Sequence, residues 1–182
     1  MKFLVTGATG FLGQRVVKQL LKRRIRVVST DVNVVKEGDM LRDRISRAGL
    51  DTGLLDLQEL DISNRKEVNQ ICAGHKFSHL ICCGYQMSNL IDSDPVRAAE
   101  VNIVGMTNLF DSLVRSAIKR LIFPSSESVY GTCQQLYGDR AVKESDYCGL
   151  QHQSFSYAVM KLLNEFMAEQ YVNTQGVSIA CT

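Results

Sequence analysis

The 182-residue chain lacks a long apolar run, a large excess of charge of either sign, and any C-x-x-C pair. No stretch approaches the roughly 20 apolar residues that a membrane-spanning helix requires, so we expect no membrane partner. The formal net charge is only +2 and there is no basic stripe, which argues against a nucleic-acid-binding protein. The apolar segment 3–5 is too short for a secretory signal and leads straight into a glycine-rich stretch.

Six cysteines are present, at positions 72, 82, 83, 133, 148 and 181. The adjacent Cys82 and Cys83 fit a buried strand better than a disulfide, so we expect reduced thiols in a cytoplasmic protein. His75 and His79 are four residues apart, a spacing that would suit a metal ion on a helix face. Segment 77–82 has the apolar pattern of a strand instead, so no metal site is expected.

Strand-like and helix-like segments alternate along the chain. Strands are predicted at 3–5, 25–31, within 54–62, at 80–83, at 119–123 and from 177. Helices are predicted after residue 10 and at 64–73, 95–116 and 156–174, with 36–50 a helix or loop and 131–155 polar and irregular. This alternation predicts one α/β domain, residues 1–182, with a doubly wound parallel sheet and helices on both faces. In such a sheet, ligands bind at the carboxyl ends of the strands.

Three glycines follow the first predicted strand at G-x-x-G-x-x-G spacing, directly before the first helix. Such a turn brings backbone amides and the positive end of a helix up to a phosphate. Gly7 would allow the tight turn, Gly10 would let the backbone approach a pyrophosphate, and Gly13 would let the helix pack close to the strand. A dinucleotide is therefore the expected ligand, and the alternative is a strand–helix turn without a ligand.

Two acidic positions follow the next two predicted strands. Asp31 lies eighteen residues beyond Gly13, where a carboxylate can accept hydrogen bonds from the hydroxyls of an adenosine ribose. It would repel a 2′-phosphate, which favours NAD over NADP. The alternative is an aspartate that caps a turn. Asp61 and Ile62 are expected to border the adenine.

Tyr157 and Lys161 are four residues apart on the predicted helix 156–174, so their side chains share one face. An unperturbed tyrosine has a pKa of about 10 and is a poor base at neutral pH. A nearby ammonium, an oxidised nicotinamide and a helix N-terminus would favour the phenolate, which could take a proton from a substrate hydroxyl. The spacing also occurs by chance on solvated helix faces. Ser125 and Ser126, which end the strand 119–123, favour the catalytic interpretation.

With these motifs in this order, the chain resembles the NAD-dependent epimerase/dehydratase family, the extended short-chain dehydrogenases/reductases. The matching segments are 6–13, Asp31, 61–62, Asn102 within 101–105, 125–131, and Tyr157 with Lys161. The resemblance implies a Rossmann-type fold, NAD as cofactor and a nucleotide sugar as substrate. It implies that Ser126 binds the reacting hydroxyl, that Tyr157 is the base, and that Lys161 holds Tyr157 and the nicotinamide ribose. The cofactor-binding residues that the motifs and the resemblance imply are Gly7, Thr9, Gly10, Phe11, Leu12, Gly13, Asp31, Asp61, Ile62, Cys83, Gly84, Asn102, Tyr157 and Lys161.

The chain also departs from the family pattern. Sugar-nucleotide dehydratases resemble Ser-Thr-Asp-Glu-Val-Tyr-Gly after the fifth strand, whereas Glu127 is followed here by Ser128. Half of that acid–base pair is missing, so an epimerase is favoured over a dehydratase. Met160 stands where the family often has serine, and segment 147–156 lacks the usual prolines.

The family normally continues past the sixth strand into a smaller substrate domain, which we expect to be missing here. A non-catalytic NAD-binding module, and an interaction domain that binds no nucleotide, therefore stay open as alternatives. Family members often form homodimers through the helices predicted here at 95–116 and 157–174.

Overall fold

The computed structural model describes residues 1–131, 137–146 and 149–182. Parts of the segment 131–155, which the sequence predicts to be irregular, lie outside the described residues, and so do Cys133 and Cys148. Within the described part, no helix is long and apolar enough to cross a membrane.

The described strands form one parallel sheet in the order β3-β2-β1-β4-β5-β6. Their bounds are β1 Lys2–Thr6, β2 Arg26–Asp31, β3 Leu55–Glu59, β4 His79–Cys82, β5 Arg120–Phe123 and β6 Ile179–Cys181. The order changes direction between β1 and β4, which is the point where open parallel sheets bind ligands. The predicted Rossmann-type sheet is confirmed, with strand ends shifted by one or two residues.

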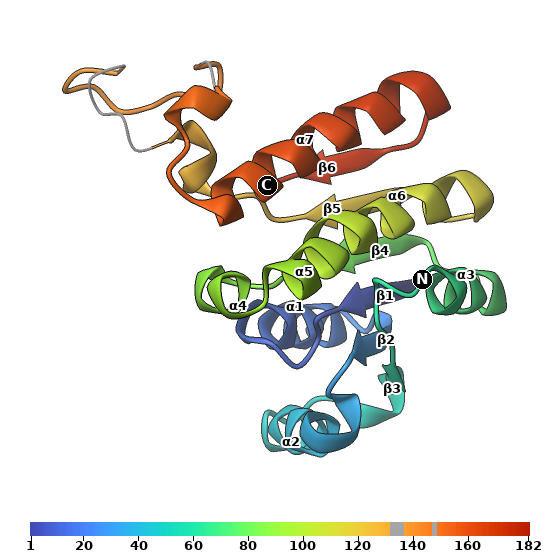
Figure 1. Cartoon of the computed structure of the whole chain (residues 1–182). Coiled ribbons are helices and arrows are strands. Elements are labelled where there is room, and N and C mark those ends of the chain that lie inside the picture. The colour runs from blue at the N-terminus through green and yellow to red at the C-terminus, as the bar shows by residue number, and fades with distance from the viewer. Residues whose placement is uncertain (132–136, 147–148) are drawn as a thin grey trace.

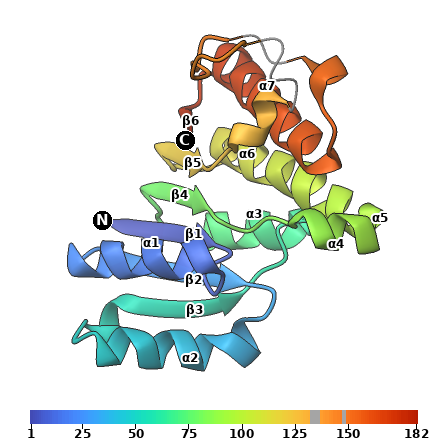
Figure 2. The same ribbon diagram turned by 90° about the vertical axis from the view of Figure 1, so that its left-hand side faces the viewer.

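Helices cover both faces of the sheet (Figure 1, Figure 2). α1 (Phe11–Lys22) and α2 (Val34–Arg47) lie on one face, and α3 (Arg65–Gly74), α6 (Met106–Arg115) and α7 (Ser156–Gln175) lie on the other. Short helical segments connect them: η1 (Thr52–Leu54), α4 (Ser88–Ser93), α5 (Pro95–Ala99), η2 (Glu100–Gly105), η3 (Glu127–Tyr130) and η5 (Leu150–His152).

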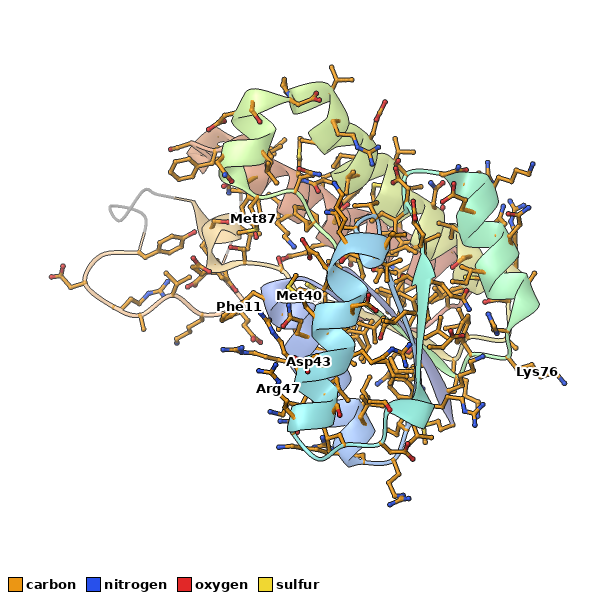
Figure 3. All side chains as sticks on the ribbon, turned by 90° about the horizontal axis from the view of Figure 1, so that it is seen from below. Phe11, Met40, Asp43, Arg47, Lys76 and Met87 are labelled. Carbon is orange, nitrogen blue, oxygen red and sulfur yellow. The ribbon has the colours of Figure 1, made fainter. Side chains whose placement is uncertain are left out.

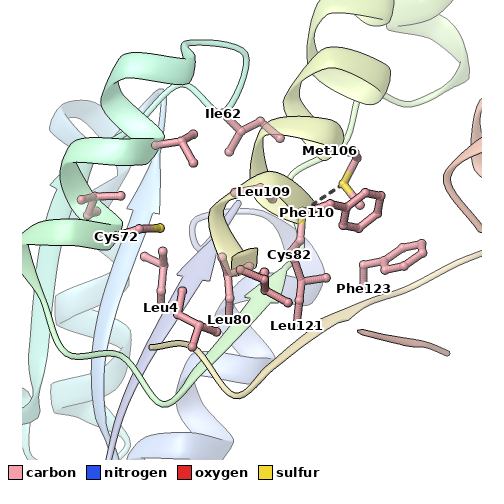
Figure 4. Close-up of a cluster of buried hydrophobic side chains, with 14 of the residues drawn as sticks. Leu4, Ile62, Cys72, Leu80, Cys82, Met106, Leu109, Phe110, Leu121 and Phe123 are labelled. Carbon is pink, nitrogen blue, oxygen red and sulfur yellow. Dashed lines mark hydrogen bonds between the residues drawn. The ribbon is translucent and has the colours of Figure 1, made fainter. Parts of the chain in front are cut away.

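Two apolar cores follow from the alternation of side chains along each strand. Phe3 and Val5 of β1 face α1 and α2, whereas Leu4 between them faces the helices of the opposite layer. Figure 4 shows the second core, in which Leu80 and Phe110 are completely buried. A sheet covered on both faces buries most residues of its central strands, such as β1 and β2, and this explains the continuous apolar runs in the sequence.

The predicted helix 95–116 is present, but it is not uniform. Asp94 caps its start by accepting a hydrogen bond from the backbone N–H of Arg97 at 2.9 Å, with Pro95 in the first turn. Between α5 and α6, segment η2 is wound as a π-helix. Such wide turns leave the regular ladder of backbone hydrogen bonds open and are frequent at functional sites. Neither this turn nor α4 was predicted from the sequence.

Candidate functional site

A groove opens beside the turns that follow β1, β2, β3 and β4, where the strand order changes direction. Its volume is about 330 Å³. Eight of the residues predicted to bind a cofactor line it: Gly7, Thr9, Gly10, Asp31, Asp61, Ile62, Cys83 and Gly84. They come from four separate turns, so the fold itself brings the predicted set together.

Gly7 and Gly13 allow the turn after β1 to lie close to its neighbours. A Cβ atom on Gly7 would be 2.3 Å from the backbone nitrogen of Gly84, and the φ of Gly7 is +65°, in the left-handed region that favours glycine. A Cβ atom on Gly13 would be 2.0 Å from the carbonyl oxygen of Gly7, so a side chain there would push α1 away from β1. The missing side chains thus let the turn after β1 pack directly against the turn after β4 and the start of α1.

The N-terminus of α1 begins at this groove, because its N-cap residue Gly10 lines it. No side chain of the described residues caps this end, so the backbone N–H groups of Phe11 and Leu12 are available to an anion. The ring of Phe11 points outward instead, 78% exposed, with the guanidinium of Arg15 4.0 Å from its centre (Figure 3). Phe11 and Leu12 can therefore contribute their backbone N–H groups to ligand binding rather than their side chains.

Asp31 lines the groove and also orders the glycine turn. Its Oδ2 atom accepts hydrogen bonds from the backbone N–H of Thr9 at 3.1 Å and from the Thr9 hydroxyl at 2.7 Å. These contacts show a structural role for Asp31, and the ribose contact stays a prediction. The carboxylate holds the turn in place, and it remains at the position predicted for a ribose contact.

Asp61, after β3, forms an ion pair across the rim of the groove. Arg97 donates from Nη2 to Oδ2 of Asp61 at 2.5 Å, and Ser63 donates to Oδ1 from its backbone at 2.9 Å and from its hydroxyl at 2.7 Å. Burial alone would raise the pKa of Asp61, but the hydrogen bonds from Ser63 and Arg97 and the Arg97 charge outweigh it and lower the pKa. The carboxylate is therefore charged at neutral pH.

Replacing Asp61 by asparagine should destabilise the chain at neutral pH, and the loss should shrink in acid. A carboxyl with a lowered pKa in the folded state stabilises the protein above its unfolded-state pKa of about 3.9, and this contribution is lost as the pH falls through the folded-state value. Urea unfolding of both proteins at about pH 7, 5 and 3 measures the difference. The exposed Asp39→Asn is the control. A difference that stays constant with pH would contradict the expectation.

Ile62, Cys83 and Gly84 form uncharged walls of the groove. Burial, with a smaller contribution from neighbouring Cys82, raises the pKa of the Cys83 thiol to about 12, so it stays protonated. Ile62 packs so closely on Gly105 that a Cβ atom there would be 2.7 Å from Cγ1 of Ile62. The groove thus combines apolar walls with three carboxylates, those of Asp31, Glu37 and Asp61.

Asn102 lies behind the groove and is not part of its lining. It is completely buried in η2, and its Oδ1 atom accepts a hydrogen bond from the backbone N–H of Gln86 at 2.8 Å. Its Nδ2 atom donates to the carbonyl oxygen of Gln86 at 3.1 Å. Its amide therefore holds Gln86 at the edge of the groove, and a direct cofactor contact by Asn102 stays a prediction.

Tyr157 and Lys161 lie in the first two turns of α7, beside the carboxyl end of β5. The Lys161 ammonium donates a hydrogen bond to the carbonyl oxygen of Pro124 at 2.7 Å and lies 5.7 Å from the centre of the Tyr157 ring. Only 3% of Lys161 is exposed. Burial lowers its pKa, although nearby thiols and Glu165 act in the opposite direction. The predicted shared helix face is confirmed.

Ser126 lies next to Tyr157, although neither Tyr157 nor Lys161 lines the groove. Burial raises the pKa of Tyr157, a hydrogen bond with Ser126 lowers it, and the charge of Glu127 raises it, so the net direction is upward. The expected lowering of this pKa is therefore not produced by the groups of the chain itself. The physical reason is that the partly buried phenol loses water, while the nearest carboxylate disfavours a second negative charge.

The two serines after β5 differ in their partners. Ser125 donates its hydroxyl hydrogen to Glu165 of α7, whereas Ser126 accepts hydrogen bonds from the hydroxyl and the backbone N–H of Ser128, at 2.9 and 3.2 Å. Both serines line a second cavity of about 530 Å³. Ser126 also has a hydrogen bond with Tyr157, so the Tyr157 phenol lies next to a residue that lines this second cavity.

Three further residues at the site were not predicted. Arg97 pairs with Asp61, Asn164 is completely buried three residues after Lys161, and Tyr85 lines the groove while contacting Lys161. The spacing of Asn164 from Lys161, on the inward face of a helix, is a signal that could have been used. The sequence contains no comparable signal for Tyr85, because a single tyrosine after a strand has no periodicity.

The model of the NAD dependent epimerase/dehydratase family matches residues 3–182. An uncharacterized 37.6 kDa protein of Escherichia coli O111:H- is 28% identical over 183 residues, covering 97% of this chain and 51% of that protein. A UDP-glucose 4-epimerase of Cyamopsis tetragonoloba is 30% identical over 130 residues, covering 70% of this chain and 37% of that enzyme. This chain thus spans about half the length of these relatives, or less.

A solved structure has the same fold. The UDP-glucose 4-epimerase of Thermus thermophilus, in a complex with NAD, superposes with a TM-score of 0.73 at 24% identity, covering 100% of this chain and 54% of that one. The family model matches nearly every residue of the chain, and the sheet order and glycine turn are those of a dinucleotide-binding fold. The chain therefore belongs to the NAD-dependent epimerase/dehydratase family, a family of enzymes.

Proposed function

We propose that residues 1–182 are the NAD-binding domain of an oxidoreductase that acts on a nucleotide sugar, as an epimerase rather than a dehydratase. The observation that carries this proposal is that Tyr157 has a hydrogen bond with Ser126 and lies with its ring centre 5.7 Å from the Lys161 ammonium, next to Tyr85, which lines the groove. A glycine turn alone would fit any nucleotide-binding module. A tyrosine with a serine on one side and a lysine on the other fits proton transfer.

The residues of the groove suit NAD. The backbone N–H groups at the start of α1 would bind the pyrophosphate, Asp31 the adenosine ribose, and Asp61 with Ile62 the adenine edge. Gly84 and Cys83 would form the wall that leads toward the nicotinamide. When bound, NAD supplies a two-electron acceptor for oxidation of a substrate alcohol.

The chain's own residues would move the proton. The Oη atom of Tyr157 would take the proton of the substrate hydroxyl, while Ser126 binds the same oxygen and fixes its distance from Tyr157. Lys161 would bind the nicotinamide ribose and add positive charge beside the phenol. Because the chain's own groups raise the pKa of Tyr157, the approach of further positive charge would be needed to make Tyr157 an effective base at neutral pH.

The nucleotide-sugar substrate is proposed from the names of relatives, several of which are UDP-glucose 4-epimerases. Glu127 is followed by Ser128, so the acid–base pair of a dehydratase is incomplete and an epimerase is favoured. A second domain, within the part of the relatives that this chain does not span, would complete the substrate site. A homodimer through α6 and α7 and a cytoplasmic location also stay predictions.

A non-catalytic NAD-binding module is the alternative function. It would fit the observation that the groups of the chain raise, rather than lower, the pKa of Tyr157. The placement of Tyr157 next to both Ser126 and Lys161 argues against it, because a module that only binds NAD has no need of a phenol held beside a buried ammonium.

The chain should bind NAD at least about tenfold more tightly than NADP. The variant Asp31→Arg should instead bind NADP at least about tenfold more tightly than NAD. The carboxylate would repel a 2′-phosphate, whereas a guanidinium would attract it. Isothermal titration of each dinucleotide into each protein measures the four dissociation constants.

Two controls separate charge from folding. Asp31→Asn keeps an acceptor for the Thr9 hydrogen bonds, so it should weaken NAD binding without favouring NADP strongly. Asp39→Arg makes the same change of net charge on the exposed face of α2 and should change neither affinity. If the unmodified chain bound neither dinucleotide, only an interaction domain without a nucleotide would remain.

A further inference from the structure

Tyr85 is in contact with both Lys161 and Tyr157. The Lys161 nitrogen lies 3.7 Å from the centre of the Tyr85 ring, which is the distance of a direct cation–π contact. The Tyr157 ring meets the same ring edge to face, with centres 5.6 Å apart and planes at 87°. Tyr85 also lines the groove, so the contacts of its ring connect the groove to Lys161 and Tyr157.

The ammonium of Lys161 depends on this ring. Lys161 is 3% exposed, and within the described residues the hydrogen bond recorded for its nitrogen is the one to Pro124. A buried ammonium with few partners is costly, and the negative face of an aromatic ring offsets part of that cost. The charged or ionisable side chains whose fields reach Lys161 are Cys82 and Cys83 of β4 and its following turn, Cys181 of β6 and Glu165 of α7. Burial raises the pKa of each of the three thiols, which therefore stay neutral at pH 7.

The orientation of Tyr85 is itself fixed. Asn164, one turn after Lys161 in α7, donates from Nδ2 to the Tyr85 hydroxyl at 3.1 Å. The same nitrogen donates at 2.9 Å to the carbonyl oxygen of Asn102, within the wide turn η2. The Tyr85 hydroxyl is therefore held from α7 by Asn164, whose amide is itself anchored to η2, and this restricts rotation of the ring away from Lys161.

We propose that Tyr85 is a positioning residue, whose ring holds the Lys161 ammonium and sets the ring of Tyr157 for proton transfer. This inference rests on the proposed function, because it assigns Tyr85 to the same proton-transfer centre. Tyr85 acts through Lys161 and Tyr157 and exchanges no proton itself: burial raises its own pKa far above the usual value, so the phenol stays protonated.

The test compares Tyr85→Leu with Tyr85→Phe. Leucine keeps the site apolar but removes the ring, whereas phenylalanine keeps the ring and removes only the hydroxyl. The pKa of Lys161 is measured on the chain without ligand, by NMR titration of lysine carbon-13 at Cε, with Lys161→Met identifying the signal. We expect the pKa of Lys161 to fall by about one unit in Tyr85→Leu and to change by less than about 0.3 unit in Tyr85→Phe.

A further variant controls for a general loss of stability, as opposed to a local effect on Lys161. Tyr171 lies in the same helix α7 but packs on Phe110, with ring centres 5.7 Å apart, away from Lys161. Tyr171→Leu should therefore destabilise the chain and leave the pKa of Lys161 unchanged. If Tyr85→Leu does not fold, Tyr85→Trp, which keeps an aromatic face, should retain the unmodified pKa.

The outcomes are distinct. An unchanged pKa in Tyr85→Leu, or an equal fall in Tyr85→Phe, would overturn the proposal. In a full-length protein that turns over, Tyr85→Leu should lower kcat about tenfold and change KM less than about twofold, since positioning acts on the reacting groups. A full-length protein that proved inactive would count against the proposed function. The titration needs no turnover, so it would still decide whether the Tyr85 ring holds Lys161.

Discussion

Tyr157→Phe should lower kcat of a full-length protein that carries this chain by about two to four orders of magnitude. Phenylalanine has no hydroxyl to accept the substrate proton, whereas the ring and its contact with Tyr85 are kept. NAD affinity should change by less than about threefold, because the pyrophosphate, ribose and adenine contacts proposed for the groove do not involve the phenol. Steady-state kinetics and isothermal titration measure the two quantities.

The pH dependence provides a second readout of the same substitution. A base accepts a proton only in its deprotonated form, so the rate should rise with pH until the pKa of Tyr157 is passed. Because the chain itself raises that pKa, any shift toward neutral pH must come with bound cofactor and substrate. The residual activity of Tyr157→Phe should lack the rise.

Tyr171→Phe is the matched control for this prediction. It removes one hydroxyl from the same helix at a position that packs against α6 rather than the site. Its kcat should match that of the unmodified protein. Turnover that survives in Tyr157→Phe at the unmodified level would remove Tyr157 from the role of base.

Local patterns in the sequence predicted most of the fold. The apolar runs of the strands, the glycine turn and the helix spacing of Tyr157 and Lys161 depend on neighbours within a few residues. The helix after Pro95 was likewise predicted from a local signal. These patterns could not predict the π-helical winding of η2, a segment that contacts the distant α7, because a local pattern contains no such long-range contact.

The electrostatic state of the site was also beyond the reach of sequence. The spacing of Tyr157 and Lys161 predicted their common face, but the pKa of Tyr157 depends on burial and on Glu127, which only the folded chain brings near. The ion pair of Asp61 with Arg97 joins positions thirty-six residues apart. Asp31 was predicted either to cap a turn or to bind a ribose, and the structure gives it the first role while leaving the second to experiment.

Gly7→Ala is expected to have the second large effect, on stability and on NAD binding together. A Cβ atom at residue 7 would meet the backbone nitrogen of Gly84 at 2.3 Å and the carbonyl carbon of Cys83 at 2.5 Å. These are backbone atoms of the turn after β4, so they cannot move aside as a flexible side chain can. We expect a loss of about 2–5 kcal/mol, the sum of left-handed backbone strain and overpacking.

Gly49 provides a matched control, because its φ of +68° is almost that of Gly7 but nothing lies within 4 Å of its Cβ position. Gly49→Ala should therefore cost only the backbone strain, about 1–2 kcal/mol, and should leave NAD affinity unchanged. Urea unfolding and NAD titration of both variants separate the clash from the strain. If the two substitutions had equal effects, contact between the turns after β1 and β4 would not determine the shape of the groove. If Gly7→Ala alone abolished binding, the close approach of these two turns would be the feature that shapes the groove for a dinucleotide.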